Sequence, residues 1–462
     1  MSAPTGPSGK LDAFFGLTAR GTSVRTEVVA GATTFMTMAY ILFVNPMILG
    51  GGRPGAIPGL LTSTALVAAV MTIAMGLLAN LPLALASGMG LNAVVAFQLV
   101  GARGLSWPQA MGVIVAEGLV ISLLVATGLR QAVVVAVPAS QKKAIGVGIG
   151  LFLAIIGFVD AGFVSRPGGG PVPVQLGLDG TLHGPAQGAT AWLFLGTLIF
   201  TAWLVLRNVK GALLIGIALS TAVAGVLRGL LGEAARLPPG AGQLPRSLLA
   251  LPDFSQLGQF SFSFVGKMGL AAAGLTVFSL MLSDFFDTVG TVVAVGQEAK
   301  YLDAEGNYPR PGTVLMVDSL AAVAGGAAGA SSATTYIESA SGAAAGGRTG
   351  LTSVVTGLLF AVGLFLSPLA GVVPPQATGA VLVLVGFLMM REVGALPWDD
   401  FTEAIPAFLT LTVMPFTYSI TNGIGAGFVA YALLKLLTGR GREVRPLMYA
   451  ASAAFLVYFL FA

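Results

Sequence analysis

Two aspartates one helical turn apart mark a place where this sequence could do chemistry. Asp284 and Asp287 occur in the apolar stretch LMLSDFFDTVGTVVAVG at a spacing of i, i+3, so both side chains lie on one face of a helix. Thr288 and Thr291 lie on or near the same face. Two adjacent carboxylates repel each other when both are ionised, so one is expected to hold a proton unless a cation lies between them. The pair therefore suits proton-coupled chemistry; the alternative is that one aspartate only caps a broken helix.

A second polar cluster occurs in the stretch SSATTYIESASGAAAGG, which contains Thr335, Glu338 and Ser339. Hydroxyls and small residues at this density favour irregular backbone, which is stable at membrane depth only where it lines a cavity. The Glu338 carboxylate can accept two N–H groups side by side, and a purine presents ring and exocyclic N–H groups in that arrangement. Asn92, in PLALASGMGLNAVVAF, offers a donor and an acceptor opposite, unless it only joins neighbouring helices.

Three further acidic residues lie in apolar stretches. Glu117 has no polar neighbour within VIVAEGLVI, so it is expected to pair across helices or to snorkel to the interface. Asp318 follows closely on the start of its segment, which predicts a structural role near the inner interface. Asp160 ends its segment and is expected to be solvated.

The elements that position these residues must be membrane helices. Only 9% of the 462 residues are charged and 55% are hydrophobic, whereas a soluble protein carries roughly 25% charged residues. The 64 glycines lie largely inside apolar runs, where small residues let membrane helices approach closely. The net charge of +4, without a long basic block, gives no indication of nucleic-acid binding. The absence of cysteine excludes disulfides and thiolate metal sites.

Fourteen apolar segments are candidates for crossing the membrane, since a spanning helix needs about 20 apolar residues. In chain order they are 28–49, 60–79, 82–100, 109–129, 144–164, 189–206, 211–227, 268–289, 313–330, 333–345, 351–373, 377–390, 404–420 and 423–437. A last apolar stretch, 447–462, could form a further helix or lie at the interface. Lys and Arg are more frequent in the connections that would be cytoplasmic if both ends of the fourteen-segment unit were inside, which predicts that orientation in the plasma membrane.

The third and tenth segments, 82–100 and 333–345, resemble each other. Both are short, rich in Gly, Ala and Ser, and polar near the middle. An odd number of spans separates matching segments, at offsets of about 230–246 residues, so the two halves would have opposite orientations. Paired, interrupted segments in inverted halves indicate the central site of a transporter. The alternative is a chance likeness between Gly/Ala-rich helices.

Five motifs carry a family resemblance: TEVVAGATTFMTMAYILFVNPMIL, SGMGLNAVVAF, QKKAIGVGIGLFLAIIGF, SDFFDTVGT and TTYIESASGAAAGGRTGLTSVVTGLLF. Through them the sequence resembles the nucleobase–cation symporter-2 superfamily, and within it the azaguanine-resistance branch of adenine/guanine/hypoxanthine permeases. The resemblance implies an all-α integral membrane protein with 14 transmembrane segments in two inverted repeats of seven, and a short β-strand in segments 3 and 10. The implied divisions are an N-terminal tail at 1–26, core-domain parts at 27–130 and 264–373, gate-domain parts at 139–232 and 374–438, and a C-terminal tail at 439–462.

Matched position by position, the resemblance makes Asp287 and Glu338 the carboxylates that face the substrate, and places Asp284 and Asn92 at further functional positions. Thr291 stands where uracil carriers of the superfamily have a histidine, so coupling through a histidine is not expected. The candidate substrate-binding residues are Asp287, Glu338, Asn92, Thr291, Ser339 and Thr335, and the candidate proton-coupling residues are Asp284, Asp287 and Glu338.

The function that the resemblance implies is secondary active import of purine nucleobases, namely hypoxanthine, guanine and adenine, by alternating access. Protons are expected as the coupling cation in preference to Na⁺, because the sequence shows no obvious cage of oxygen ligands. The alternatives are a xanthine/uracil-type permease of the same fold and an uncoupled nucleobase facilitator. The xanthine/urate branch has Gln-Asn where this chain has Glu338-Ser339, which weakens that alternative.

Other classes of function fit less well. An enzyme is not expected, because no metal-binding histidine pair, nucleophile elbow or phosphate loop occurs in the sequence. An inorganic anion would be repelled by the carboxylates. No cofactor or metal site is expected. The expected partners are a purine base, a coupling cation and the lipid bilayer, and a homodimer is one candidate assembly.

Overall fold

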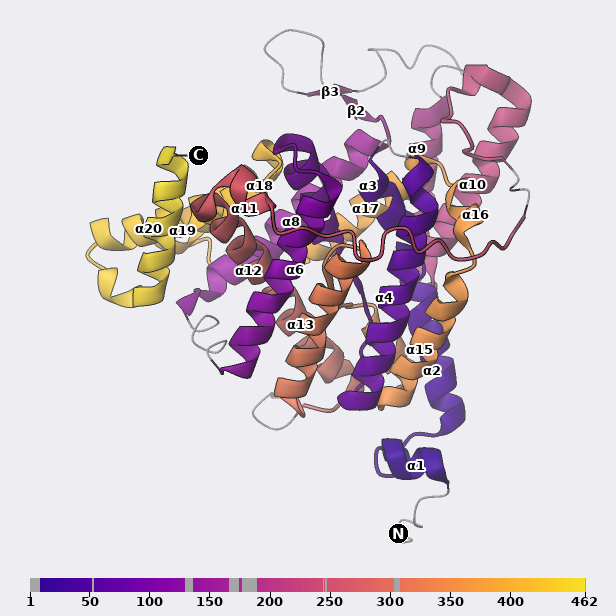
Figure 1. The fold of residues 1–462 in the computed structure, drawn as a ribbon, viewed down its shortest axis with the longest axis horizontal. Coiled ribbons are helices and arrows are strands. Elements are labelled where there is room, and N and C mark those ends of the chain that lie inside the picture. The colour runs from indigo at the N-terminus through magenta and orange to yellow at the C-terminus, as the bar shows by residue number, and fades with distance from the viewer. Residues whose placement is uncertain are drawn as a thin grey trace.

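The fold is a bundle of apolar helices, shown in Figure 1. The computed structural model describes residues 9–51, 54–128, 136–165, 174–176, 189–243, 245, 247–302 and 308–461. Residues 1–8 of the expected N-terminal tail, residues 129 and 130 at the expected end of the first core part, and residue 462 lie outside the described residues.

The elements follow the predicted segments. The first half of the chain contains α1 (Lys10–Phe15), α2 (Val24–Met38), α3 (Ile41–Gly50), η1 (Pro54–Ala56), α4 (Ile57–Leu78), β1 (Leu85–Ser87), α5 (Met89–Ala93), η2 (Val94–Ala102), α6 (Trp107–Ala126), α8 (Ala139–Asp160), β2 (Val164–Ser165), β3 (Gln175–Leu176), α9 (Ala189–Leu206), α10 (Ala212–Leu231) and η3 (Gly232–Ala235). The second half contains α11 (Phe264–Met268), α12 (Leu270–Ala299), α13 (Pro311–Ala328), β4 (Ala333–Thr335), α14 (Ser339–Ala344), α15 (Gly350–Gly363), α16 (Ser367–Ala370), α17 (Pro375–Met389), η4 (Met390–Ala395), α18 (Phe401–Thr417), α19 (Ile420–Leu437), η5 (Gly441–Glu443) and α20 (Pro446–Phe461).

Within the described part of the chain, 10 helical stretches are long and apolar enough to cross a membrane. The chain is therefore a multi-pass membrane protein. Three further predicted segments are shorter apolar helices, Met89–Ala102, Gly350–Gly363 and Phe401–Thr417. Segment 333–345 contains only strand β4 and the six-residue helix α14. Fourteen crossings therefore stay a prediction, because helix length and composition do not establish the shorter ones.

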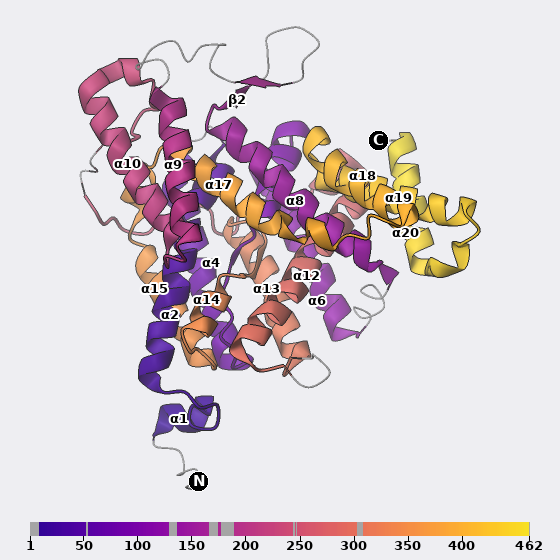
Figure 2. The ribbon, with the colours of Figure 1, turned by 180° about the vertical axis from the view of Figure 1, so that it is seen from behind.

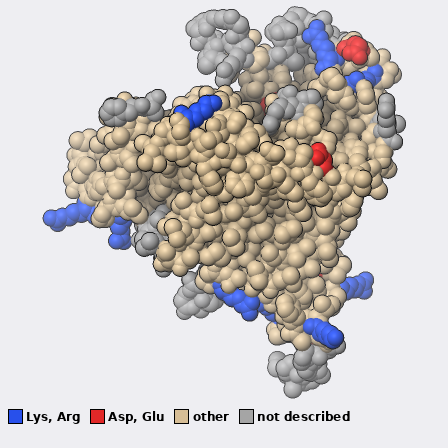
Figure 3. Space-filling view, in the orientation of Figure 1, with Lys and Arg blue, Asp and Glu red and all other residues tan. Residues whose placement is uncertain are grey.

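The surface agrees with a lipid environment. Large apolar side chains such as Ile199, Leu230 and Phe416 are exposed on the outer helices. Figure 3 shows a wide central area of one face without charged side chains, and basic groups mostly toward the ends of the molecule. A surface of this kind would be unstable in water and is stable in a bilayer.

Helix contacts in one half of the chain are repeated in the other. Helix α4 packs on α15, and its counterpart α13 packs on α6. Helix α2 contacts α14, and its counterpart α12 contacts α5. The pair formed by α8 and α18 has its counterpart in α17 and α9, while α8 and α17 pack on each other. These paired contacts are what two inverted repeats predict.

Glycines allow a close crossing between α8 and α17. A Cβ atom on Gly150 would lie 2.6 Å from the carbonyl oxygen of Gly386. Two turns further along α8, Gly157 approaches Gly379 of α17 in the same way. A Cβ on either residue would lie 2.5 Å from the carbonyl oxygen of the other. Both helices carry their glycines seven residues apart, so the two backbones meet along one shared seam.

The helices form two layers, which Figure 2 shows from the side of the first: α10, α9, α17, α8, α18 and α19 extend across the molecule in front of α4, α13, α12 and α6. The front helices fall in the segments expected in the gate and the rear helices in those expected in the core; the division into two domains stays a prediction. Contacts of α8 with α5 and α12, and of α19 with α12, join the layers. Helix α20 packs on both α19 and α12.

Candidate functional site

Two short strands pair at the centre of the rear layer. Strands β1 and β4 are antiparallel, with Leu85 opposite Thr335 and Ser87 opposite Ala333. The pairing continues beyond the strands, since the Tyr336 N–H donates to the Ala84 carbonyl at 2.9 Å. Each strand uses backbone groups that a continuous helix would have used internally, so each satisfies the other where both helices are interrupted. The strands that the resemblance implied in segments 3 and 10 are at these positions.

Neighbouring helices hold the strands by equivalent contacts. The Thr72 hydroxyl of α4 accepts from the Leu85 N–H at 2.9 Å and donates to the Leu85 carbonyl at 3.0 Å. The Asp318 carboxylate of α13 accepts from the Thr335 N–H at 3.1 Å and from the Thr288 hydroxyl at 2.7 Å. Because α4 and α13 are counterparts in the inverted repeats, the strand pair is fixed from both halves of the chain.

Asp287 and Glu338 form the accessible part of the site. Asp287 lies midway along α12 and is exposed, and Glu338 precedes α14 and is partly exposed. The two carboxylates interact electrostatically with each other and with Tyr40 and Tyr336, which are buried. These two carboxylates are therefore the accessible members of a group of interacting acidic and tyrosine side chains from several elements.

A second acidic cluster lies deeper. Asp284, Asp318 and Glu117 come from α12, α13 and α6, are at most 1% exposed, and interact electrostatically with one another. Among the described residues, neither Asp284 nor Glu117 has a hydrogen bond of good geometry, although Thr334 and Ser332 lie beside them. Unpaired buried charges are costly, so this cluster must be neutralised by protons or a bound cation when the protein is folded.

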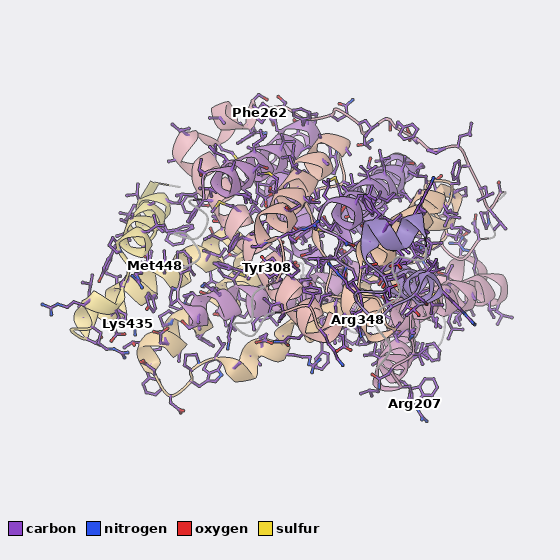
Figure 4. The ribbon with its side chains drawn as sticks, turned by 90° about the horizontal axis from the view of Figure 1, so that it is seen from below. Arg207, Phe262, Tyr308, Arg348, Lys435 and Met448 are labelled. Carbon is purple, nitrogen blue, oxygen red and sulfur yellow. The ribbon has the colours of Figure 1, made fainter. Side chains whose placement is uncertain are left out.

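Among the described residues, no basic group is paired with Asp284 or Glu117. Ion pairs occur instead near the C-terminus, where Lys435 pairs with Glu403 and Glu443, each at 2.8 Å, and Arg440 pairs with Asp400 at 2.8 Å and with Glu443 at 2.7 Å. Figure 4 shows Lys435 among the C-terminal helices, well away from the labelled Arg348 of the rear layer.

The structure separates the predicted site residues into groups. Asp287 and Glu338 lie together, while Asp284, one turn away, belongs to the deeper cluster. Asn92 is completely buried, and neither its amide nitrogen nor its amide oxygen has a partner among the described residues. The Thr335 hydroxyl is buried and similarly unpaired within the described part of the chain.

The other two predicted residues are engaged or further away. The Ser339 hydroxyl accepts from the Ala84 N–H at 2.9 Å, so it supports the strand pair directly. Thr291 is buried one turn beyond Asp287 on α12. Its neighbour Thr288 bridges to Asp318 and, at 2.8 Å, to the Thr334 hydroxyl.

Three expectations about acidic residues can be compared with the structure. Asp318 is buried beside β4, because the turn between α13 and β4 returns the chain along the helix, and its bond to the Thr335 N–H is a structural role of the kind expected. Glu117 interacts across helices, one of its two expected alternatives, with groups of α12, α13 and the residue before β4 that its own segment could not reveal. Asp160 is partly buried rather than solvated.

Sequence reasoning also missed Tyr40. Its hydroxyl donates to Glu338 Oε1 at 2.7 Å across 298 positions of the chain. A buried tyrosine hydroxyl needs a partner, and segment 1 was expected to match segment 8, which carries the aspartates. That correspondence was the signal that could have drawn attention to Tyr40.

Comparison with known proteins decides the family. A family model described as "Permease family" matches residues 25–426. The chain belongs to this permease family. The adenine permease AdeQ of Escherichia coli is 41% identical over 451 residues, covering 97% of this chain and 96% of that protein. The guanine/hypoxanthine permease PbuG of Bacillus subtilis is 38% identical over 466 residues, covering 98% of this chain and all of that protein. The family resemblance inferred from the motifs is confirmed. The prediction that the chain is a transporter and not an enzyme is confirmed as well.

The fold also has a solved counterpart. The transmembrane domain of the cyanobacterial bicarbonate transporter BicA superposes with a TM-score of 0.61, covering 87% of this permease and 97% of that chain, at 16% sequence identity. Identity this low shows a shared fold and carries no information about the substrate.

Proposed function

We propose that this permease imports purine nucleobases, with hypoxanthine, guanine and adenine as the substrates, by proton symport. The observation that carries the proposal is the accessible pair of carboxylates, Asp287 and Glu338, beside the paired strands β1 and β4. Support comes from relatives that match nearly the whole chain and are named adenine and guanine/hypoxanthine permeases.

Recognition would depend on hydrogen bonds to a neutral base. Carboxylates accept from ring and exocyclic N–H groups, and the unpaired amide of Asn92 could add a donor and an acceptor. Bases that ionise readily, such as xanthine and urate, would meet repulsion from Asp287 and Glu338. This distinguishes the proposal from a xanthine/uracil-type permease of the same fold.

Coupling of proton movement to purine transport would depend on the cluster of acidic side chains. Asp284, Asp287 and Glu338 are the proposed proton-coupling residues, and the deeper cluster adds Glu117 and Asp318 to their electrostatic environment. No group of three or more acidic or histidine side chains among the described residues is arranged to hold a metal ion, which favours protons over Na⁺. Protonation and purine binding at interacting groups must change each other's affinity by the same factor.

Transport would proceed by movement of the front layer relative to the rear layer. The gate would comprise residues 139–232 and 374–438, and the core residues 27–130 and 264–373. Both Asp287 and the strand pair belong to the core, so the core would carry the substrate past the gate. The expected location is the plasma membrane, with both ends of the fourteen-segment unit in the cytoplasm.

Uptake of radiolabelled purines tests the proposal, in cells that lack their own nucleobase permeases. Expression of the chain should give accumulation of hypoxanthine, guanine or adenine, with unlabelled xanthine and urate as weak competitors. A protonophore should abolish accumulation and leave only equilibration. Uptake that merely equilibrates before the protonophore is added would instead identify an uncoupled facilitator, and preferred uptake of xanthine or urate would contradict the substrate assignment.

A further inference from the structure

Tyr40 lies where the first membrane segment is interrupted, between α2 and α3. Below the interruption, the Thr33 and Thr37 hydroxyls donate to backbone carbonyls of the preceding turn, a contact that bends helices. Above it, Pro46 inside α3 has no N–H for the preceding turn. Tyr40 is 1% exposed, so packing fixes its ring in one place.

Within the described part of the chain, the Tyr40 hydroxyl donates to Glu338 Oε1 at 2.7 Å. We propose that Tyr40 is a positioning residue of the substrate site, which orients the Glu338 carboxylate toward the bound base. The inference rests on the proposed function, because it assigns Tyr40 a part in purine binding through Glu338.

The chemistry of the neighbourhood supports this assignment. A hydroxyl donated to a carboxylate forms a strong hydrogen bond without introducing a positive charge that would compete with the substrate's N–H groups. It occupies one oxygen and fixes the plane of the carboxylate. The groups facing Tyr40 are Glu338, Asp287 and Tyr336. Tyr336 cannot take over this task in the observed arrangement, because its hydroxyl donates to the Ser87 carbonyl.

The Tyr40→Phe variant tests the assignment, since it removes the hydroxyl and keeps the ring. Tyr449→Phe is the matched control, because the Tyr449 hydroxyl donates to the Gly441 carbonyl at 2.9 Å, outside the site. We expect Tyr40→Phe to raise the Kd of purified protein for the transported purine, and the KM of uptake, by about tenfold, the effect of losing a hydrogen bond to a charged group. The Vmax per correctly folded protein should change by less than about twofold.

A double-mutant cycle separates positioning from general packing. Glu338→Asp withdraws the carboxylate from Tyr40 by one methylene, so adding Tyr40→Phe to it should weaken binding little further. Equal effects of Tyr40→Phe in both backgrounds would overturn the proposal. If Glu338→Asp binds too weakly to measure, the single variant decides alone, and an unchanged Kd in Tyr40→Phe overturns it. Failure of the wild-type protein to bind any purine would count against the proposed function and be seen before either variant is compared.

Discussion

The contacts that hold the two strands offer a quantitative test of how the site is built. Thr72 and Asp318 secure opposite strands, at Leu85 and Thr335, but only Asp318 is ionisable in the physiological range. In Asp318→Asn, one acceptor oxygen becomes an NH₂ group, so either the Thr335 N–H loses its acceptor or the Thr288 hydroxyl must accept from that NH₂ group and donate to Thr334 instead. A buried donor left unsatisfied costs about 1–3 kcal/mol, which corresponds to a factor of about 5–150 in an equilibrium constant.

The neutral counterpart separates strand support from charge. Thr72→Val removes the hydroxyl that bonds both backbone groups of Leu85, at a similar cost. If strand geometry positions the site, both variants should weaken purine binding by about tenfold. Only Asp318→Asn should change the pH dependence of binding, because Asp318 interacts electrostatically with Asp284 and Asp287.

The assay is purine affinity of the purified protein at several pH values. Asp400→Asn serves as the control, because the Asp400 carboxylate also accepts from a backbone N–H and a threonine hydroxyl, both of Thr402, but caps α18 away from the site. It should leave the affinity unchanged. Normal affinity in Thr72→Val would refute the idea that strand support positions the site. An unchanged pH profile in Asp318→Asn would refute the electrostatic link.

Two further predictions concern stability. Gly150→Ala should lower the melting temperature, because the new Cβ would lie 2.6 Å from the Gly386 carbonyl oxygen and overpacking costs about 1–3 kcal/mol. Gly146→Ala on the same helix is the control and should not lower it, since its Cβ would meet nothing within 4 Å. Equal melting temperatures of the two variants would contradict the close packing of α8 on α17. Hydrogen bonds from Arg440 chiefly lower the pKa of Glu443 to about 2, so this carboxylate's contribution to stability should be complete above about pH 5 and be lost as the pH falls toward 2. A melting profile of Arg440→Gln as steep as that of the wild type over this range would contradict it.

Much of the fold could be predicted from the sequence because hydrophobic length is a strong signal in membranes. Each predicted segment contains helix, and in 82–100 and 333–345 the density of Gly, Ala and Ser correctly indicated interrupted backbone, because each also contains a short strand. The pairing of Asp287 with Glu338 also followed from the residues and the resemblance. Segment-by-segment reasoning failed where contacts cross the chain. Tyr40 bonds to Glu338 from the other half of the chain, and Asp318 bonds to Thr335 across the turn between α13 and β4. Neither contact can be predicted from the hydrophobic periodicity of a single segment.

The balance of charge at the site is likewise a tertiary property. Glu117 looked isolated because its segment is apolar, yet α6 packs on α13 and α12 and brings it to Asp318 and Asp284. The sequence predicted three clustered carboxylates, and the structure has five in two connected groups. The sequence did not indicate that the Ser339 hydroxyl accepts from the Ala84 N–H, and the part of Ser339 in substrate binding stays a prediction.

Purine uptake into proteoliposomes under an imposed proton gradient tests the central claim most directly. Wild-type protein should accumulate labelled hypoxanthine or adenine above the external concentration when the inside is alkaline, without Na⁺, and a protonophore should end the accumulation. Glu338→Ala, reconstituted in the same amount, should take up no more than empty liposomes, because the carboxylate that accepts the purine N–H groups is gone. Accumulation that requires Na⁺ and ignores the proton gradient, or full uptake by Glu338→Ala, would contradict the account.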